Sequence, residues 1–158
     1  SGYMDPDDIR AHCYIRAMAD AGIPKIHITT NQLSNPSEQT YDAYRTVTKY
    51  LAVNDAPEAA FCYNDQTAIG VYRALYEAGY KIPDDVAIVG CDGIDMTEYL
   101  TPALTTIVQP LKEMCNLAWE FLQNRIKNPD IQRQSAVLKC RLEVRGSSCI
   151  SELATPVI

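Results

Sequence analysis

One stretch, residues 59–93, constrains the fold of this chain more than any other. Its first five residues, AAFCY, are apolar almost without a break, which is typical of a parallel strand covered by helices on both faces. Helical periodicity follows, Gly79 is placed to end that helix, and residues 86–89 form a second apolar run that stops at Gly90. The pattern predicts a parallel β-α-β unit. The buried stripe of its helix is expected to contain Ala68, Ile69, Tyr72, Leu75 and Tyr76.

Polar residues follow both strands of this unit at their carboxyl ends. Tyr63, Asn64 and Asp65 follow the first strand, and Asp92 follows the second. Ligands of open parallel sheets bind just beyond the carboxyl ends of the strands, so these residues are candidates to bind a small polar molecule. The structural alternative is that Asp65 caps the helix and Asp92 stabilises a glycine turn. We expect Asp65 to be the cap, and we favour a ligand role for Asn64 and Asp92.

A helix is expected near the amino end, where Asp5 and Pro6 predict its start and Gly22 and Pro24 its end. Arg10 lies in the first turns, where the positive end of the helix dipole favours acidic residues instead. Its guanidinium group offers a planar fork of donors that suits paired sugar hydroxyls or a carboxylate. We weigh this ligand role against that of a solvated surface arginine.

A strand and a second helix are expected between that helix and the β-α-β unit. Residues 25–29 predict a short strand, and residues 30–36 predict a loop on the same sheet edge as Asn64. Ser37 is the predicted N-cap of a helix that runs to about residue 53. Its buried stripe is expected to contain Tyr44, Val47, Thr48 and Leu51.

Three further elements are expected after the unit. Residues 104–108 predict a short strand, and the following Gln109 is restrained toward an extended backbone by the proline after it. Residues 110–127 predict a helix and residues 136–144 a final strand, whereas residues 93–102 are polar and leave room for one helical turn. The apolar stripe of this last helix contains Leu111, Met114, Cys115, Ala118, Phe121, Leu122 and Ile126.

Several motifs resemble the effector-binding domain of lactose-repressor (LacI) family transcription regulators. They are NDQTAIG at 64–70, IPDDVAIVGCD at 82–92, YLTP at 99–102, LTTIVQP at 104–110 and EVRGSS at 143–148. The resemblance implies an α/β fold, a three-layer sandwich with a mostly parallel sheet that forms one lobe of a periplasmic-binding-protein-like fold plus a returning helix and strand. The resemblance assigns residues 1–108 to the C-terminal lobe, residues 109–148 to the returning helix and strand that would complete a first lobe, and residues 149–158 to a tail.

The resemblance also implies roles for individual residues. In the family, an arginine that corresponds to Arg10 begins an R-x-x-G-aromatic pattern and holds the effector, and here Cys13 replaces the glycine. The family's sugar-stacking aromatic corresponds to Glu38, which puts that stacking in question. No residue is expected to be catalytic. The expected ligand-binding residues are Arg10, Tyr63, Asn64, Asp65, Asp92 and Gln109.

The function implied by the resemblance is effector sensing in a DNA-binding transcription regulator that is cytoplasmic and homodimeric. A small polar metabolite, with a sugar as the expected case, would bind without being altered and signal by lobe closure. DNA would be contacted only through a helix-turn-helix headpiece that this chain lacks, and residues 110–145 would need substitute neighbours, by pairing between chains or in a poorly ordered tail. The alternative with the same fold is a solute-binding protein of an ABC-type sugar uptake system.

Composition argues against several other functions. The net charge of −6 makes direct binding of DNA phosphates by this segment unfavourable, and no run reaches the ~18 apolar residues of a membrane span. The six cysteines show no C-x-x-C spacing, so neither a metal centre nor a disulfide framework is expected, and unpaired thiols fit a reducing compartment. The G-x-S-x-G, G-x-x-x-x-G-K-[ST] and G-x-G-x-x-G motifs are all absent, so no enzymatic activity and no cofactor are expected.

Overall fold

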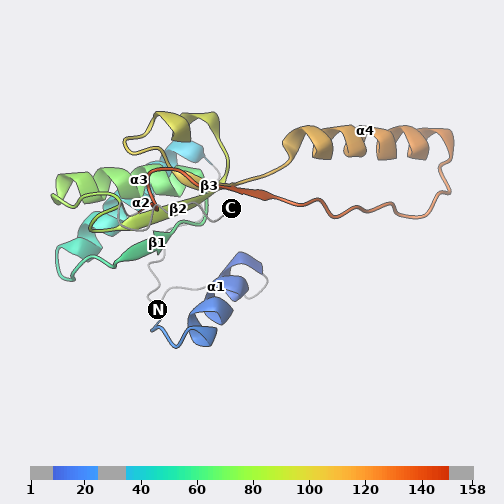
Figure 1. The fold of residues 1–158 in the computed structure, drawn as a ribbon. Coiled ribbons are helices and arrows are strands. Elements are labelled where there is room, and N and C mark those ends of the chain that lie inside the picture. The colour runs from blue at the N-terminus through green and yellow to red at the C-terminus, as the bar shows by residue number, and fades with distance from the viewer. Residues whose placement is uncertain (1–8, 25–34, 150–158) are drawn as a thin grey trace.

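The computed structural model describes residues 9–24 and 35–149 (Figure 1). The expected strand at 25–29, most of the loop at 30–36, the start of the first helix at 5–8 and the tail from residue 150 lie outside the described residues. The described elements are α1 (Ile9–Asp20), α2 (Pro36–Leu51), β1 (Ala59–Phe61), α3 (Asp65–Glu77), β2 (Ala87–Asp92), the 3-10 helix η1 (Asp95–Tyr99), β3 (Thr105–Val108), α4 (Leu111–Lys127) and β4 (Arg141–Glu143).

The described strands form one mixed sheet in the order β1-β2-β3-β4. β1 and β3 both run parallel to β2, and β4 runs antiparallel to β3. This arrangement confirms the α/β fold class and the mostly parallel sheet. Because β1, β2 and β3 point the same way, their carboxyl ends meet at a single edge, where Asp92 is paired in register with Val108.

The hydrophobic core of the lobe lies between α3, α2 and the sheet. Tyr72 and Leu75 of α3 are buried as predicted, and burial raises the pKa of Tyr72 to about 12. Gly70 lets α2 approach α3 closely, because a Cβ at that position would overlap the Thr40 carbonyl oxygen. The other members of this cluster are Val47, Cys62, Ala68, Val71, Ala74, Val86, Ile88 and Leu104.

Two side chains predicted to lie on buried stripes face solvent instead. Tyr76 is 77% exposed because it lies about 100° further round α3 than the buried Leu75, beyond the face that packs on the lobe. Thr48 of α2 is also exposed, and its hydroxyl donates to the carbonyl of Tyr44 within the same helix at 2.8 Å. The buried face of α2 is instead centred on Ala43 and Val47.

The N-cap of α2 is Asn35 rather than the predicted Ser37. The Asn35 Oδ1 atom accepts hydrogen bonds from the Ser37 backbone N–H at 3.1 Å and from the Ser37 hydroxyl at 2.7 Å. Pro36 therefore occupies the first helical position, where its missing N–H carries no penalty. The helix ends at Leu51, two residues before the expected end.

β1 is shorter and more exposed than the fully covered strand that its apolar sequence predicted. It contains three residues, and Phe61 at its end is 42% exposed. The reason is its position at the edge of the described sheet, where only β2 pairs with it. Cys62, directly after the strand, is buried against the core.

Residues 109–143, here called the arm, leave the lobe and return to it (Figure 1). α4 stands apart from the sheet and contains no buried residue, so its apolar side chains, including Trp119 at 58% exposed and Leu122 at 50%, face solvent. The predicted final strand at 136–144 is reduced to Arg141–Glu143, since only these residues lie beside β3 and share its hydrogen bonds. No helix in the described part of the chain has the length and apolar character needed to cross a bilayer.

The segment after the arm folds back onto the lobe. Ser147 is fully buried, and its hydroxyl donates to the carbonyl of Ile88 at 2.6 Å and accepts from the Thr105 N–H at 2.8 Å. Its own backbone pairs with Ile88 and Ala103. These bonds join the beginnings of β2 and β3, so this segment is an integral part of the lobe.

Candidate ligand-binding site

Candidate ligand-binding residues gather at the carboxyl edge of the parallel strands. Tyr63 and Asn64 follow β1, Asp92 ends β2, and Gln109 follows β3. The side chain of Arg10 comes from α1 and reaches the same edge through its contact with Tyr63. The structure therefore brings together residues that are up to 99 positions apart in the sequence.

Arg10 lies across the ends of β1 and β2. Its guanidinium carbon is 3.6 Å from the centre of the Tyr63 ring, and Nη1 donates to the Tyr63 carbonyl oxygen at 3.1 Å. Burial and the Asp92 carboxylate raise the pKa of the Cys91 thiol, and the nearby Arg10 guanidinium partly offsets that rise. Arg10 is thus a positively charged group held at the sheet edge rather than an arginine extended into solvent.

Asp92 and Gln109 form a direct pair at the ends of β2 and β3. The Gln109 Nε2 atom donates to Asp92 Oδ1 at 2.7 Å. Asp92 Oδ2 and Gln109 Oε1 can each accept a further hydrogen bond. Asp92 has a φ angle of 125°, a conformation that costs a residue with a side chain ~1–3 kcal/mol and that concentrates at functional sites.

Asn64, and not Asp65 as predicted, is the N-cap of α3. Asn64 has an extended backbone, and its Oδ1 atom accepts from the Thr67 N–H at 2.9 Å. Its Nδ2 atom donates to Gln39 Oε1 of α2 at 3.0 Å. The side chain of Asn64 therefore both caps α3 and links it to α2, so a ligand would have to use its remaining hydrogen-bonding capacity.

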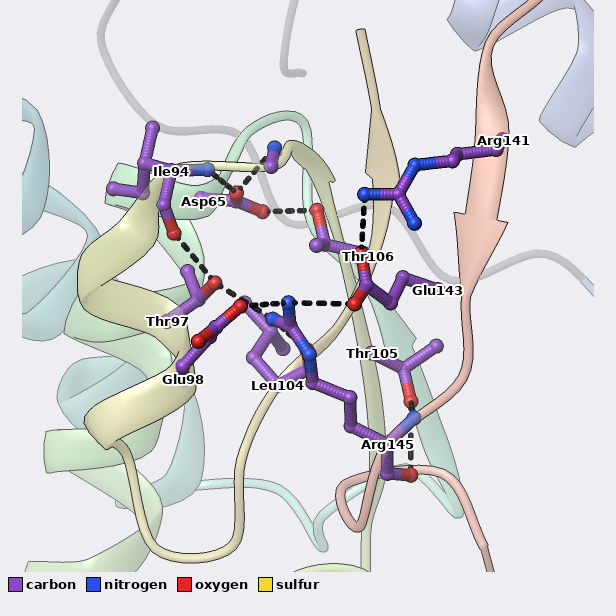
Figure 2. A network of polar contacts seen from close by, with 11 residues as sticks. Asp65, Ile94, Thr97, Glu98, Leu104, Thr105, Thr106, Arg141, Glu143 and Arg145 are labelled. Atoms are coloured by element: carbon purple, nitrogen blue, oxygen red, sulfur yellow. Dashed lines mark hydrogen bonds and ion pairs between the residues drawn. The ribbon is translucent and has the colours of Figure 1, made fainter.

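Asp65 is fully buried, and its oxygens face protein groups rather than the open edge (Figure 2). Oδ2 accepts from the backbone N–H groups of Gly93 and Ile94 at 2.8 and 2.9 Å, and Oδ1 accepts from the Thr106 hydroxyl at 2.7 Å. Gly90 lies against this carboxylate so closely that a Cβ there would overlap it. Asp65 thus joins the loop after β2 to β3.

A second buried polar group was not predicted from the sequence. The Arg145 side chain is 14% exposed, and its Nη1 atom donates to the Thr97 hydroxyl and to the Leu104 carbonyl, each at 3.1 Å (Figure 2). Its Nη2 atom pairs with Glu98 at 2.8 Å and Glu143 at 3.2 Å. The only available signal was the terminal EVRGSS motif, which indicated the family without indicating this role.

A hollow of about 460 Å³ lies beside the site, where the arm leaves the lobe. Val108, Gln109, Arg141 and the first residues of α4 line it, whereas Arg10, Asn64 and Asp92 do not. Those three residues therefore contribute to an open surface next to the hollow.

The groups at this edge suit hydrogen bonding better than metal binding or covalent chemistry. Arg10 supplies donors, and Asp92 and Gln109 supply acceptors. No group of three His, Cys, Asp or Glu side chains able to hold a metal ion occurs within residues 9–24 and 35–149. Sugar hydroxyls can both donate and accept, so they match this mixture of groups.

Comparison with known proteins relates most of the chain to one protein family. Residues 3–148 match the periplasmic binding protein-like domain. The HTH-type transcriptional repressor PurR of Photobacterium profundum is 33% identical over 149 residues, which cover 93% of this chain and 44% of that protein. The ribose operon repressor of Escherichia coli is 37% identical over 145 residues, which cover 90% of this chain and 42% of that protein.

Solved structures give the same relationship. A LacI family transcriptional regulator from Enterococcus faecium with bound ribose has a TM-score of 0.76 and 34% identity, covering 88% of this chain and 50% of that one. A regulator of the same family from Arthrobacter in complex with lactose has a TM-score of 0.78 and 26% identity, covering 91% and 52%. The chain spans about half the length of these proteins or somewhat less. It belongs to the periplasmic binding protein-like domain family, and its relatives are LacI-family transcription regulators.

Proposed function

We propose that this chain supplies one side of the effector cleft of a DNA-binding transcription regulator and that the effector is a sugar. The observation that carries this proposal is the meeting of Arg10, Tyr63, Asn64, Asp92 and Gln109 at the carboxyl edge of one parallel sheet. Ligands of such sheets bind at this edge. The names of the relatives add support, since one is a ribose operon repressor and two regulator structures contain ribose or lactose.

The chemistry of the edge favours a neutral polyhydroxyl ligand over an anion. Gln109 uses its amide nitrogen on Asp92, which leaves oxygens of both side chains to accept bonds from the ligand. Hydroxyl groups can donate to these oxygens, whereas a phosphate or carboxylate would meet the negative charge of Asp92. Arg10 would then donate to other hydroxyl oxygens of the same ligand.

Signalling would proceed by closure of the cleft. Gln109 is the first residue of the arm, so a ligand bound to Asp92 and Gln109 contacts both the lobe and the point where the arm leaves it. A ligand shifts an equilibrium only by its difference in affinity for the two states, and contacts on both sides of a hinge supply such a difference. The parent regulator would act as a cytoplasmic homodimer and bind DNA through a separate headpiece.

The solute-binding alternative has the same fold but less support. The relatives named above are repressors, which are regulators rather than enzymes or transport components. All six cysteines are free thiols, as expected for a reducing compartment rather than for an oxidising one. We also propose that the chain has no catalytic activity, because the groups at the edge bind by hydrogen bonds and none is arranged as an activated nucleophile.

Ligand-induced stabilisation tests the proposal. Ribose and lactose would be added to the parent regulator, with both sides of the cleft present, in a thermal unfolding assay, where a sugar at ~100 times its dissociation constant adds about 2.7 kcal/mol to the stability. Arg10→Ala and Asp92→Ala should abolish the shift. Arg16→Ala and Asp84→Ala are the matched controls, since Arg16 is on the exposed side of the same helix and Asp84 is in an exposed turn.

Two results would contradict the proposal in different ways. An equal sugar-induced shift in Arg10→Ala, Asp92→Ala and the unaltered chain would show that the ligand binds elsewhere. A shift produced by anionic metabolites but by no sugar would show that the ligand class is wrong.

A further inference from the structure

Among the described residues, Asp65 is the charged residue with no exposed surface. It is fully buried and accepts three hydrogen bonds, from the Gly93 and Ile94 N–H groups and from the Thr106 hydroxyl. None of the ion pairs found among the described residues involves it. A buried carboxylate is unfavourable unless donors compensate it, and here the backbone N–H groups and the amino end of α3 provide that compensation.

One oxygen of Asp65 fixes the backbone directly after Asp92. Gly93 and Ile94 are the next two residues of the chain, and both of their N–H groups point at Asp65 Oδ2. Asp92 itself has a φ angle of 125°, which residues other than glycine rarely adopt. Such a conformation persists only where the surroundings hold it, and the bonds to Gly93 and Ile94 act there beside the strand pairing of Asp92 with Val108 and its bond with Gln109.

The other oxygen of Asp65 holds the strand that carries Gln109. Thr106 lies on β3, three residues before Gln109, and β3 is paired in register with β2 so that Asp92 lies beside Val108. Asp65 therefore contacts both segments whose ends form the Asp92–Gln109 pair. Asp65 has no exposed surface, so it does not contact a ligand directly in this conformation.

We propose that Asp65 is a positioning residue for ligand binding: it holds Asp92 and Gln109 in the relative orientation that accepts the ligand's hydroxyl groups. This inference rests on the proposed function. Loss of the Asp65 contacts releases Asp92 from its unusual backbone conformation and breaks its bond with Gln109. Ligand affinity then falls even while the lobe remains folded.

A purely structural role for Asp65 makes a different prediction, namely lower stability with unchanged affinity. Ser147 provides the control for that case. Ser147 is fully buried, as Asp65 is, and its hydroxyl makes two hydrogen bonds. It lies at the beginnings of β2 and β3, away from the ligand edge. Ser147→Ala should therefore destabilise the chain without changing ligand affinity.

The test uses Asp65→Asn and Thr106→Val, with Ser147→Ala as control, in the parent regulator at a temperature at which each variant is folded. Ribose binding would be measured by calorimetry or by NMR titration. We expect the dissociation constant to rise by about tenfold or more, equivalent to ~1.4 kcal/mol, in Asp65→Asn and to a smaller extent in Thr106→Val. Ribose affinity in Ser147→Ala should stay unchanged. Thr106→Val removes one hydroxyl from a nearly isosteric side chain, so it keeps the test valid if Asp65→Asn does not fold.

A readout without ligand separates this inference from the proposed function. Amide hydrogen exchange of Gly93 and Ile94 and the side-chain amide signal of Gln109 report the positioning directly. In Asp65→Asn, exchange at both amides should accelerate and the Gln109 signal should lose the shift caused by Asp92. Unchanged signals, or unchanged ribose affinity in a chain that binds ribose, would overturn the inference. Absence of any sugar binding with altered Gly93, Ile94 and Gln109 signals would overturn the proposed function alone.

Discussion

Helices α3 and α4 have similar amphipathic patterns, but only α3 is packed. Seven of the residues of α3 are buried, whereas α4 has none. α3 lies between α2 and the sheet, and its Gly70 allows close contact with α2. α4 belongs to the arm, which stands away from the lobe (Figure 1).

The contrast shows that an apolar stripe identifies a helix face that needs a partner without identifying the partner. α3 finds its partner within the lobe, close to it in sequence. On α4, Leu111, Trp119, Leu122 and Ile126 are each at least half exposed. Exposed apolar surface is typical of interaction sites, so we still predict that this part of the chain needs substitute neighbours.

Thiol reactivity should give the largest difference between the two regions. Burial, with a smaller effect from Asp65, raises the pKa of Cys62 from 9.0 to about 12, whereas Cys115 on α4 is exposed. That rise in the pKa lowers the reactive thiolate fraction of Cys62 roughly a thousandfold. Cys115 should react first with a thiol reagent at pH 8, and Cys62 only when the lobe opens. Equal rates in single-cysteine variants would show that the lobe is not packed as described.

Truncation of one leucine in each region should separate their contributions to stability. Leu75→Ala leaves a cavity in the core and should lower the free energy of unfolding by ~2–5 kcal/mol. Leu122→Ala removes a half-exposed side chain and should change it by less than about 0.5 kcal/mol in dilute protein. Urea unfolding followed by circular dichroism measures both. A large loss in dilute Leu122→Ala would mean that the arm packs on the lobe in solution.

Self-association should depend on the apolar face of α4. We expect the chain to dimerise as its concentration rises, and Trp119→Glu to weaken the dimer by about tenfold or more by placing a charge on that face. Analytical ultracentrifugation gives the dissociation constant, and the emission of Trp119, the only tryptophan, reports contact at the arm. Val53→Glu, at an 82% exposed site of the lobe, is the control. A compact monomer at all concentrations would contradict this prediction.

The smallest effect is expected at the surface pair that joins α2 to α3. The Tyr44 hydroxyl donates to Glu77 Oε2 at 2.7 Å, which lowers the pKa of Glu77, with a further contribution from Arg73. The same bond raises the pKa of Tyr44. The stabilisation is present at pH values above the ordinary Glu77 pKa of 4.5 and is lost as the pH falls through the lowered pKa. The contribution of the Tyr44 hydroxyl is present at pH values below its ordinary pKa of 10.0 and is lost as the pH rises through the raised pKa.

Tyr44→Phe should therefore slightly lower the melting temperature at pH 7 and have no effect in strong acid. Tyr50→Phe, on the same helix, should show no such pH dependence. Thermal melts between about pH 3 and about pH 8, a range that includes the protonation of Glu77, would measure the difference. A constant difference across that range would show that the Tyr44–Glu77 bond does not form.

Local sequence patterns predicted most elements but misplaced several contacts. Gly79 lies just after α3, as expected of a glycine that ends a helix, and has a positive φ of 85°. Gln109 directly follows β3. Both predicted N-caps were wrong by one or two positions. Asn64 caps α3 in place of Asp65, and Asn35 caps α2 in place of Ser37. Propensity identifies residue types that can cap, whereas the entering backbone decides which one does.

The role of Asp65 could not be predicted from its neighbours in sequence. Its partners, Gly93, Ile94 and Thr106, are 28 to 41 positions away. The Asp65 carboxylate can bond these groups because Asn64, and not Asp65, caps α3. Arg145 and Ser147 were missed for the same reason, since their partners lie on β2, β3 and η1.

The sequence by itself determined the β-α-β unit, the helices and the polar residues after each strand, because these follow from periodicity and turn chemistry over a few neighbouring positions. Only the tertiary structure decided which apolar faces are buried and which polar groups meet. Burial of α3 and exposure of α4 depend on whether another surface packs against each helix. The Asp92–Gln109 bond and the contact of Arg10 with Tyr63 depend on how α1 and the parallel strands pack together, which the local patterns did not specify.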